Sequence, residues 1–188
     1  MSDAGQPAPG HFRYQPFYCE ENAWWLCAEP ALAPSPGTAR GGAQVLFIVN
    51  RAGHCPFAGQ RAGARGEIIW WDYHVVLLDA ARRIWDLDTR LGLPLPAADW
   101  LTGSFPFIAR LPAALAPRFR LVPCAEYRRD FASDRSHMRD SAGRWRHPPP
   151  PWPAIGRGMR LPRYLHPDAP EPGQLLDYQG LLRLLSGR

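Results

Sequence analysis

The most constraining feature of this sequence is an apolar, β-rich run from Glu67 to Asp79, interrupted by two polar residues, Asp72 and His74. Residues two apart in a strand point to the same face, so both polar side chains are expected on one side of a buried strand. A second short strand is predicted at Ile84 to Asp88, with Asp79 to Arg83 as the connection. The sequence therefore predicts a hairpin with a histidine inside its apolar core.

The register of this hairpin decides which acids meet the histidine. A three-residue loop, Asp79-Ala80-Ala81, places Asp86 directly opposite His74, with Asp88 diagonal on the same face. A loop one residue shorter or longer inverts the second strand and turns both aspartates away. A buried histidine needs a hydrogen-bond partner whether it is a core residue or a catalytic base, and an opposing Asp86 satisfies both interpretations. Asp88 could also orient the imidazole, but the favoured interpretation is a cap of the turn towards Thr89 and Arg90.

Cys19 is the candidate nucleophile that the His74–Asp86 pair would activate. It opens a predicted helix from Cys19 to Ala28, which contains no Gly or Pro and is stopped by Pro30. Unpaired amides and the helix dipole favour a thiolate at this position. Glu20 and Glu21 suit a helix start but oppose a thiolate unless they point away or pair with cations. The alternative for Cys19 is a buried structural thiol, the commonest role of free cysteine.

The bulk properties favour one globular domain. A chain of 188 residues, 46% hydrophobic and 12% aromatic, is long enough for one substantial core, and its 22 prolines predict many irregular connections. The net charge is +5, but the basic residues are scattered and no nucleic-acid module accompanies them, so no nucleic-acid partner is expected. No segment resembles a signal-peptide core or is apolar enough to cross a bilayer, so a cytoplasmic protein without a membrane partner is expected.

A metal centre is not expected, because the four cysteines lack the paired spacing of a zinc site. A set made of His54, Cys55 and His74 also lacks ligand spacing. A second polar cluster, Asp134 and His137, has two interpretations, a turn tied to backbone amides and a direct catalytic role. The turn is favoured, and the segment could still form a pocket rim.

Other segments are assigned from their composition. The predictions are a loose leader (1–13), a linker (31–42), a buried strand (Gln44 to Asn50), a Gly/Arg loop (51–66), a helix (Pro112 to Phe119), an ordered loop (Phe131 to Met138), an extended proline run (Pro148 to Pro153) and an amphipathic helix (Leu175 to Leu185).

Five motifs, taken in order, resemble the protein N-terminal glutamine amidohydrolase family. They are Tyr-Cys-Glu-Glu-Asn at 18–22, Trp-Asp-Tyr-His-Val-Val-Leu-Leu at 71–78, Asp-Leu-Asp-Thr at 86–89, Phe-Ala-Ser-Asp-Arg-Ser-His-Met at 131–138 and four prolines at 148–151. The resemblance covers residues 12–155. It implies a single-domain α+β fold of the papain/transglutaminase kind, with an antiparallel sheet, an N-terminal helix that carries the nucleophile, and a triad of Cys19, His74 and Asp86.

The resemblance also implies an activity. A member of this family hydrolyses the side-chain amide of a glutamine at a protein's first position, through a thioester and without a cofactor, so its partners are proteins or peptides that begin with glutamine. A monomer is expected. A carboxylate should recognise the substrate's amino terminus, and Glu21, Asp72 and Asp134 are the candidates. Residues 30–42, 51–66 and those after Ile155 depart from the family pattern. The alternatives are a transglutaminase-like enzyme or a cysteine peptidase with the same triad, and a non-enzymatic binding module.

Overall fold

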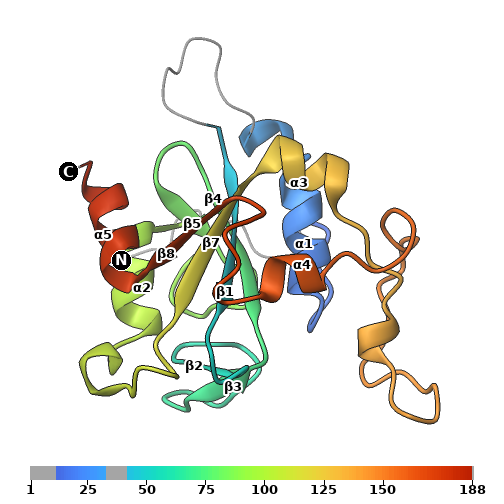
Figure 1. The fold of residues 1–188 in the computed structure, drawn as a ribbon, viewed down its shortest axis with the longest axis horizontal. Helices are drawn as coiled ribbons and strands as arrows, with labels where there is room; N and C mark the ends of the chain where they lie inside the picture. The colour runs from blue at the N-terminus through green and yellow to red at the C-terminus, as the bar shows by residue number, and fades with distance from the viewer. Residues whose placement is uncertain (1–11, 33–41, 188) are drawn as a thin grey trace, which may run out of the picture.

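The computed structural model of the protein describes residues 12–32 and 42–187, where helices and an antiparallel sheet form an α+β fold (Figure 1). Almost all of the predicted leader and most of the predicted linker lie outside these residues. One sheet has six strands in the order β6-β5-β4-β1-β7-β8, all antiparallel, and a second sheet pairs β2 with β3. The strands are β1 (Gln44–Val49), β2 (Cys55–Phe57), β3 (Ile69–Trp71), β4 (His74–Leu78), β5 (Arg83–Trp85), β6 (Leu95–Pro96), β7 (Arg118–Pro123) and β8 (Gln174–Asp177).

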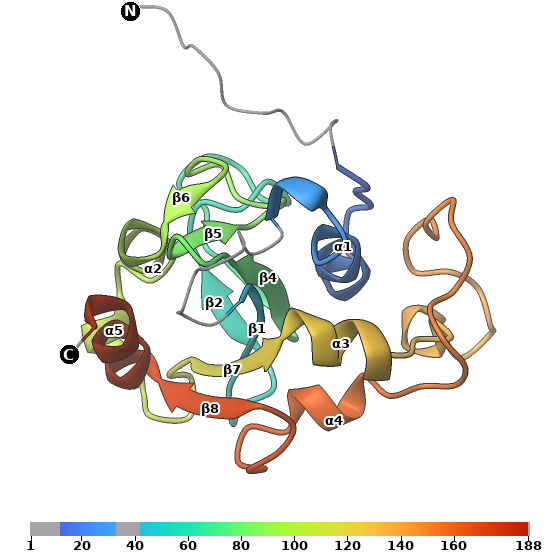
Figure 2. The same ribbon diagram turned by 90° about the horizontal axis from the view of Figure 1, so that it is seen from above.

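Helices cover both faces of the six-stranded sheet, as Figure 2 shows from above. Because side chains alternate along a strand, β1 sends Val45 and Phe47 to one face and Leu46 and Ile48 to the other. The first face packs on α1, α3 and α4, and the second on α2, α5 and the β2–β3 sheet. The helices are α1 (Cys19–Leu26), α2 (Ala97–Ser104), α3 (Cys124–Asp130), α4 (Pro162–Leu165) and α5 (Tyr178–Ser186), with 3-10 turns η2 (Pro30–Leu32), η3 (Ile108–Arg110) and η4 (Ser136–Met138).

Two predicted elements are confirmed closely. The apolar run from residue 44 forms β1 at the centre of the sheet, with its last five residues buried. The acidic, aromatic segment forms α1, which begins at Cys19 as expected and ends at Leu26, two residues earlier than predicted.

Other predictions were wrong in extent or in kind. The run from 67 to 79 is two strands of different sheets, since a bend at Asp72 separates β3 from β4. No helix forms at 112–119, where Pro117 precedes strand β7. The C-terminal helix begins only at Tyr178, because residues 174–177 form the edge strand β8. Helices α2 and α3 were not predicted at all.

The hairpin has the predicted parity but not the predicted loop. Strands β4 and β5 pair Leu77 with Trp85 and Leu78 with Ile84, so the three-residue loop is 80–82 and not 79–81. The reason is Asp79, whose carboxylate accepts hydrogen bonds from the amides of Ala81 and Arg83 and from the Trp85 indole. These bonds hold Asp79 at the end of the strand. The placement of Asp86 directly opposite His74 is therefore corrected, although both aspartates keep the face of His74.

None of the helices in the described part of the chain is both long and apolar enough to cross a membrane.

Candidate active site

A cavity of about 830 Å³ lies where the start of α1 meets the edge of strand β4. Cys19 and His74 both line it, together with Asp72 from the β3–β4 connection, Asp88 from the segment after β5, and His137 from turn η4. Its remaining walls are largely aromatic and apolar. The cavity thus brings together side chains from four separate parts of the sequence, including the two residues predicted as nucleophile and base.

His74 lines the cavity and forms a buried pair with Asp86, which does not line it. The Nε2 atom of His74 lies 2.9 Å from Oδ1 of Asp86, and each side chain is 1% exposed. Asp86 also accepts from the backbone amide of Asp88, and its second oxygen accepts from Gln60 Nε2 at 3.1 Å and from Trp100 Nε1 at 3.0 Å. Four hydrogen bonds therefore hold this carboxylate ionised and fixed in place.

These contacts move both protonation equilibria. Burial alone would raise the pKa of Asp86, but the neighbouring His74 and the donors on its oxygens lower it below the ordinary value. Burial lowers the pKa of His74, yet the charge and hydrogen bond of Asp86 outweigh it and the net pKa is raised. Because Nε2 faces Asp86, the ring atom left for chemistry is Nδ1, which makes no hydrogen bond within the described residues. Asp86 thus orients the imidazole of His74 and leaves its Nδ1 atom available for proton transfer.

The thiol of Cys19 lies at the first position of α1 and is 8% exposed. The side chain of Tyr18, the residue before the helix, does not cap the first backbone amides of α1. The backbone N–H of Val75, next to His74, donates toward the sulfur. Among described side chains the hydrogen-bond partner of the thiol is Glu20, at 3.7 Å, and not His74. Burial and the charge of Glu20 raise the pKa of this thiol well above its ordinary value, so the resting group is a neutral S–H.

Glu21 was a candidate for binding a substrate amine, but its oxygens are already occupied. Arg135 donates to both of them at 2.7 and 2.8 Å, and the indole of Trp152 donates to Oε2 at 2.7 Å. The side chains of Glu21 and Arg135 are 0% and 8% exposed. This pair ties the start of α1 to the loop before η4, which is a structural task.

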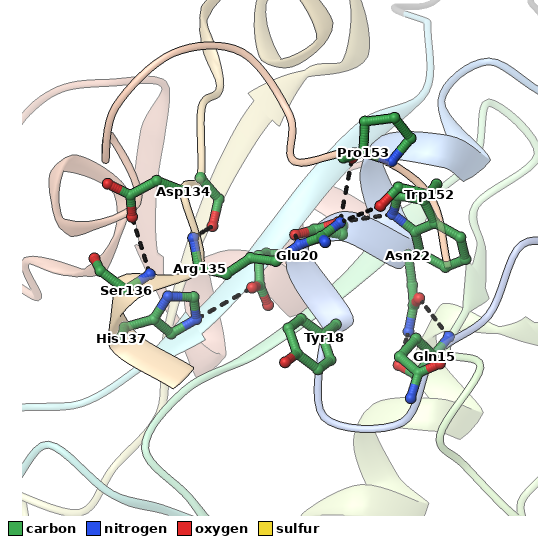
Figure 3. Close-up of polar contacts among 12 residues, drawn as sticks. Gln15, Tyr18, Glu20, Asn22, Asp134, Arg135, Ser136, His137, Trp152 and Pro153 are labelled. Atoms are coloured by element: carbon green, nitrogen blue, oxygen red, sulfur yellow. Dashed lines mark hydrogen bonds and ion pairs between the residues drawn. The ribbon is translucent and has the colours of Figure 1, made fainter. Parts of the chain in front are cut away.

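The two other candidate carboxylates differ in position. Asp134 is exposed and accepts from the amide of Ser136 at 2.9 Å, the capped turn expected from the sequence, and Figure 3 shows it turned toward that amide. Asp134 does not line the cavity. Asp72 is also exposed but does line it, at the bend that separates β3 from β4. Of the three candidates, Asp72 is therefore the one whose position fits contact with a ligand in this cavity.

Asp88 lies deeper than its predicted role as a turn cap requires. It is 7% exposed, lines the cavity and accepts a hydrogen bond of 2.6 Å from the hydroxyl of Tyr14. Burial raises its pKa. The oxygens of Asp86 and Asp88 and a ring nitrogen of His74 lie within 4.8 Å of one another, which makes them the cluster of described residues able to surround a cation. The set of His54, Cys55 and His74 does not form such a cluster among these residues.

Sequence reasoning missed two residues that support Asp86. Gln60 lies in the Gly/Arg loop and Trp100 in the unpredicted helix α2, and the local sequence of neither one points to the site. The only available signal for Trp100 is general, since a buried indole N–H needs an acceptor.

Comparisons with known proteins agree with the motifs. A sequence model of the family described as N-terminal glutamine amidase matches residues 14–184. A cattle protein named protein N-terminal glutamine amidohydrolase is 36% identical over 167 residues, which cover 85% of this chain and 79% of the relative. Proteins of the same name from human and zebrafish are 36% and 35% identical, covering 77% and 79% of this chain and 72% and 75% of the relatives.

Proposed function

Because this chain belongs to the N-terminal glutamine amidase family, we propose that it hydrolyses the side-chain amide of a glutamine at the first position of a protein or peptide, with release of ammonia. The observation that carries the proposal is that His74 and Cys19 line one cavity, with Asp86 paired to His74 behind the cavity wall. A thiol and an imidazole that share one cavity, with an acid that orients the imidazole, are the groups that acyl transfer requires.

The proposed roles follow from the free atoms of the three residues. As the sulfur of Cys19 bonds to the side-chain carbonyl carbon, the thiol proton passes to Nδ1 of His74. The C–N bond breaks when His74 returns this proton to the nitrogen, and ammonia leaves. His74 then takes a proton from water as the water oxygen bonds to the thioester carbon. The C–S bond breaks, His74 returns the proton to the sulfur, and glutamate leaves. Asp86 holds the imidazole in one tautomer and stabilises its charge.

The tetrahedral intermediate carries a negative oxygen that needs donors. The backbone amide of Cys19 lies at the first position of α1, where no Tyr18 side chain caps it. Helix N-termini favour negative charge. We therefore assign the oxyanion contact to this amide. The proposed architecture is that of the papain and transglutaminase enzymes, one domain in which a helix bearing the nucleophile packs on an antiparallel sheet bearing the base.

Specificity for an amino terminus is assigned to Asp72. A substrate ammonium needs a carboxylate that faces the cavity, and Asp72 is exposed there while Glu21 is paired with Arg135. Asp72→Asn should raise KM for a Gln-initiated peptide with little change in kcat, because the lost contact is made equally in the ground state and the transition state. Asp134→Asn, in the capped turn outside the cavity, is the matched control and should change neither constant.

The experiment that tests the activity compares three peptides: one that begins with Gln, one that begins with Asn, and one with Gln only in its interior. Ammonia release and the small mass gain of amide-to-acid conversion are followed for each. Turnover of the first peptide alone is the expected result, and Cys19→Ala should abolish it while Cys124→Ala, outside the cavity, should not.

Other outcomes point to other functions. Equal turnover of the internal glutamine removes the specificity proposed here. Peptide cleavage indicates a cysteine peptidase, and glutamine modification that depends on an added amine indicates a transglutaminase. Absence of all three activities leaves a binding module.

A further inference from the structure

Glu20 is a buried acid in direct contact with the proposed nucleophile. Its side chain is 0% exposed, and its Oε2 atom accepts from the Cys19 thiol at 3.7 Å and from the Tyr73 hydroxyl at 3.2 Å. An anion at this distance opposes a second negative charge on the sulfur. A thiol enzyme that keeps such an acid beside its nucleophile must offset it.

The second oxygen of Glu20 shows where that offset comes from. Oε1 is buried and accepts no hydrogen bond within the described part of the chain. The ring of His137 points at it from turn η4, with Nε2 at 3.3 Å (Figure 3). The same Nε2 atom lies 3.3 Å from the Tyr73 hydroxyl. Glu20, His137 and Tyr73 therefore close into a triangle with one corner against the sulfur.

We propose that Glu20, His137 and Tyr73 form one polar unit that sets how much of Cys19 is present as thiolate. His137 is a positioning residue in this unit, because it acts on the sulfur through Glu20. The inference rests on the proposed function only in taking Cys19 as the nucleophile. It assigns a role to His137 of the 131–138 motif, which the proposed triad does not use.

The direction of each contribution follows from charge. Glu20 keeps the resting thiol neutral, because its carboxylate disfavours a neighbouring anion and accepts the S–H hydrogen bond. Nε2 of His137 lies 3.3 Å from Oε1 of Glu20, and a proton carried on this atom draws negative potential away from the sulfur. Tyr73 does the same through its hydroxyl. Removing Glu20 should therefore favour the thiolate, and removing His137 should disfavour it.

Other ionisable groups surround the sulfur and remain constant in this comparison. They are His74 on β4, Asp86 and Asp88 after β5, and Tyr127 on α3, whose hydroxyl donates to the backbone oxygen of Glu20. Arg135 acts on Glu20 from the loop before η4. None of these is changed by the substitutions below.

The test measures the thiol without any substrate. The rate of alkylation of Cys19 by iodoacetamide is followed across pH for the full chain. The Cys19→Ser protein supplies the background from the three remaining cysteines. Glu20→Gln keeps the shape of the side chain and removes its charge. His137→Phe keeps the ring and removes the donor, whereas His137→Gln restores a donor. Thermal melting confirms that each variant is folded.

The expected shifts have opposite signs. Glu20→Gln should lower the midpoint of the alkylation profile by about one pH unit or more, and His137→Phe should raise it by about one unit. His137→Gln should leave the midpoint of the alkylation profile close to that of the unmodified protein. In the Glu20→Gln background, His137→Phe should move the midpoint by no more than about 0.3 units, because the group through which it acts is gone.

Two results would overturn the inference. One is an unchanged midpoint in Glu20→Gln, and the other is an equal His137→Phe shift with and without Glu20. If His137→Phe does not fold, Tyr73→Phe carries the same test, since it removes one donor to Glu20 and should raise the midpoint. Failure of the proposed function looks different, because the alkylation shifts would then occur in a protein that leaves Gln-initiated peptides unchanged.

Discussion

Two buried acids near the candidate nucleophile, Asp86 and Glu20, have opposite surroundings. Asp86 accepts four hydrogen bonds, from His74, Gln60, Trp100 and a backbone amide, and its pKa is lowered. One oxygen of Glu20 accepts none from the described residues, and the other accepts from a thiol and a phenol. A saturated carboxylate fixes the geometry of its partners. A carboxylate with fewer donors has a less compensated negative charge, and in Glu20 that charge acts on the neighbouring sulfur of Cys19.

Glu21 extends the comparison, because it follows Glu20 in the sequence and is equally buried. Its two oxygens take three hydrogen bonds from Arg135 and Trp152, so it belongs with Asp86 among the saturated acids. Two adjacent glutamates in α1 therefore have different tasks. Glu21 fixes the helix to the 131–138 loop, and Glu20 contacts the thiol of Cys19.

The largest expected effect is on the activity of Asp86→Asn. The amide cannot stabilise a charged imidazole and can present the wrong atom to Nε2, which favours the wrong tautomer of His74. The rate constant kcat should fall by about 10³- to 10⁴-fold. Steady-state turnover of a Gln-initiated peptide measures it, with Glu20→Gln as the comparison. A fall of similar size in Glu20→Gln would contradict the distinction between the two acids.

The next largest effect is on the stability of Arg135→Met. This change leaves the charge of Glu21 buried without its partner and should lower the free energy of unfolding by about 3–5 kcal/mol. Urea denaturation followed by tryptophan fluorescence measures it. The double variant Glu21→Gln/Arg135→Met removes both charges and should recover most of the loss. A double variant as unstable as the single one would show that Arg135 acts through packing and not through the ion pair.

The sequence predicted those features of the site that depend on residues close together in the chain. Apolar alternation predicted that Asp86 and Asp88 share one face of the second strand, but that this is the face of His74 depended on a three-residue loop. It could not fix the loop, since the outcome depends on three hydrogen bonds to Asp79 that no periodicity reports. The start of α1 at Cys19 followed from the same kind of local signal.

The long-range part was not predictable. Glu21 meets Arg135 across 114 residues and Asp86 meets Gln60 across 26, and nothing in a single sequence couples such positions. The choice of Asp72 over Glu21 depends on the first of these contacts and on the bend that places Asp72 at the cavity. Helix α2 was missed because Gly103 and the surrounding prolines weaken the helical signal, while burial of Trp100 and Leu101 against the sheet decides the structure.

The smallest expected effect is the change of stability with pH that the His74–Asp86 pair causes. Asp86 has a folded pKa below its ordinary value of 3.8, so its contribution is present above that pH and is lost as pH falls through the folded pKa. His74 has a folded pKa above its ordinary value of 6.5, so its contribution is complete below that pH and is lost as pH rises through the folded pKa. The pair therefore stabilises the fold most between these two values. The free energy of unfolding, measured by urea denaturation across pH, should exceed that of His74→Gln most in this window. A difference that keeps growing above the window would mean that His74 is bound in its neutral form, and the charge assigned to this pair would be wrong.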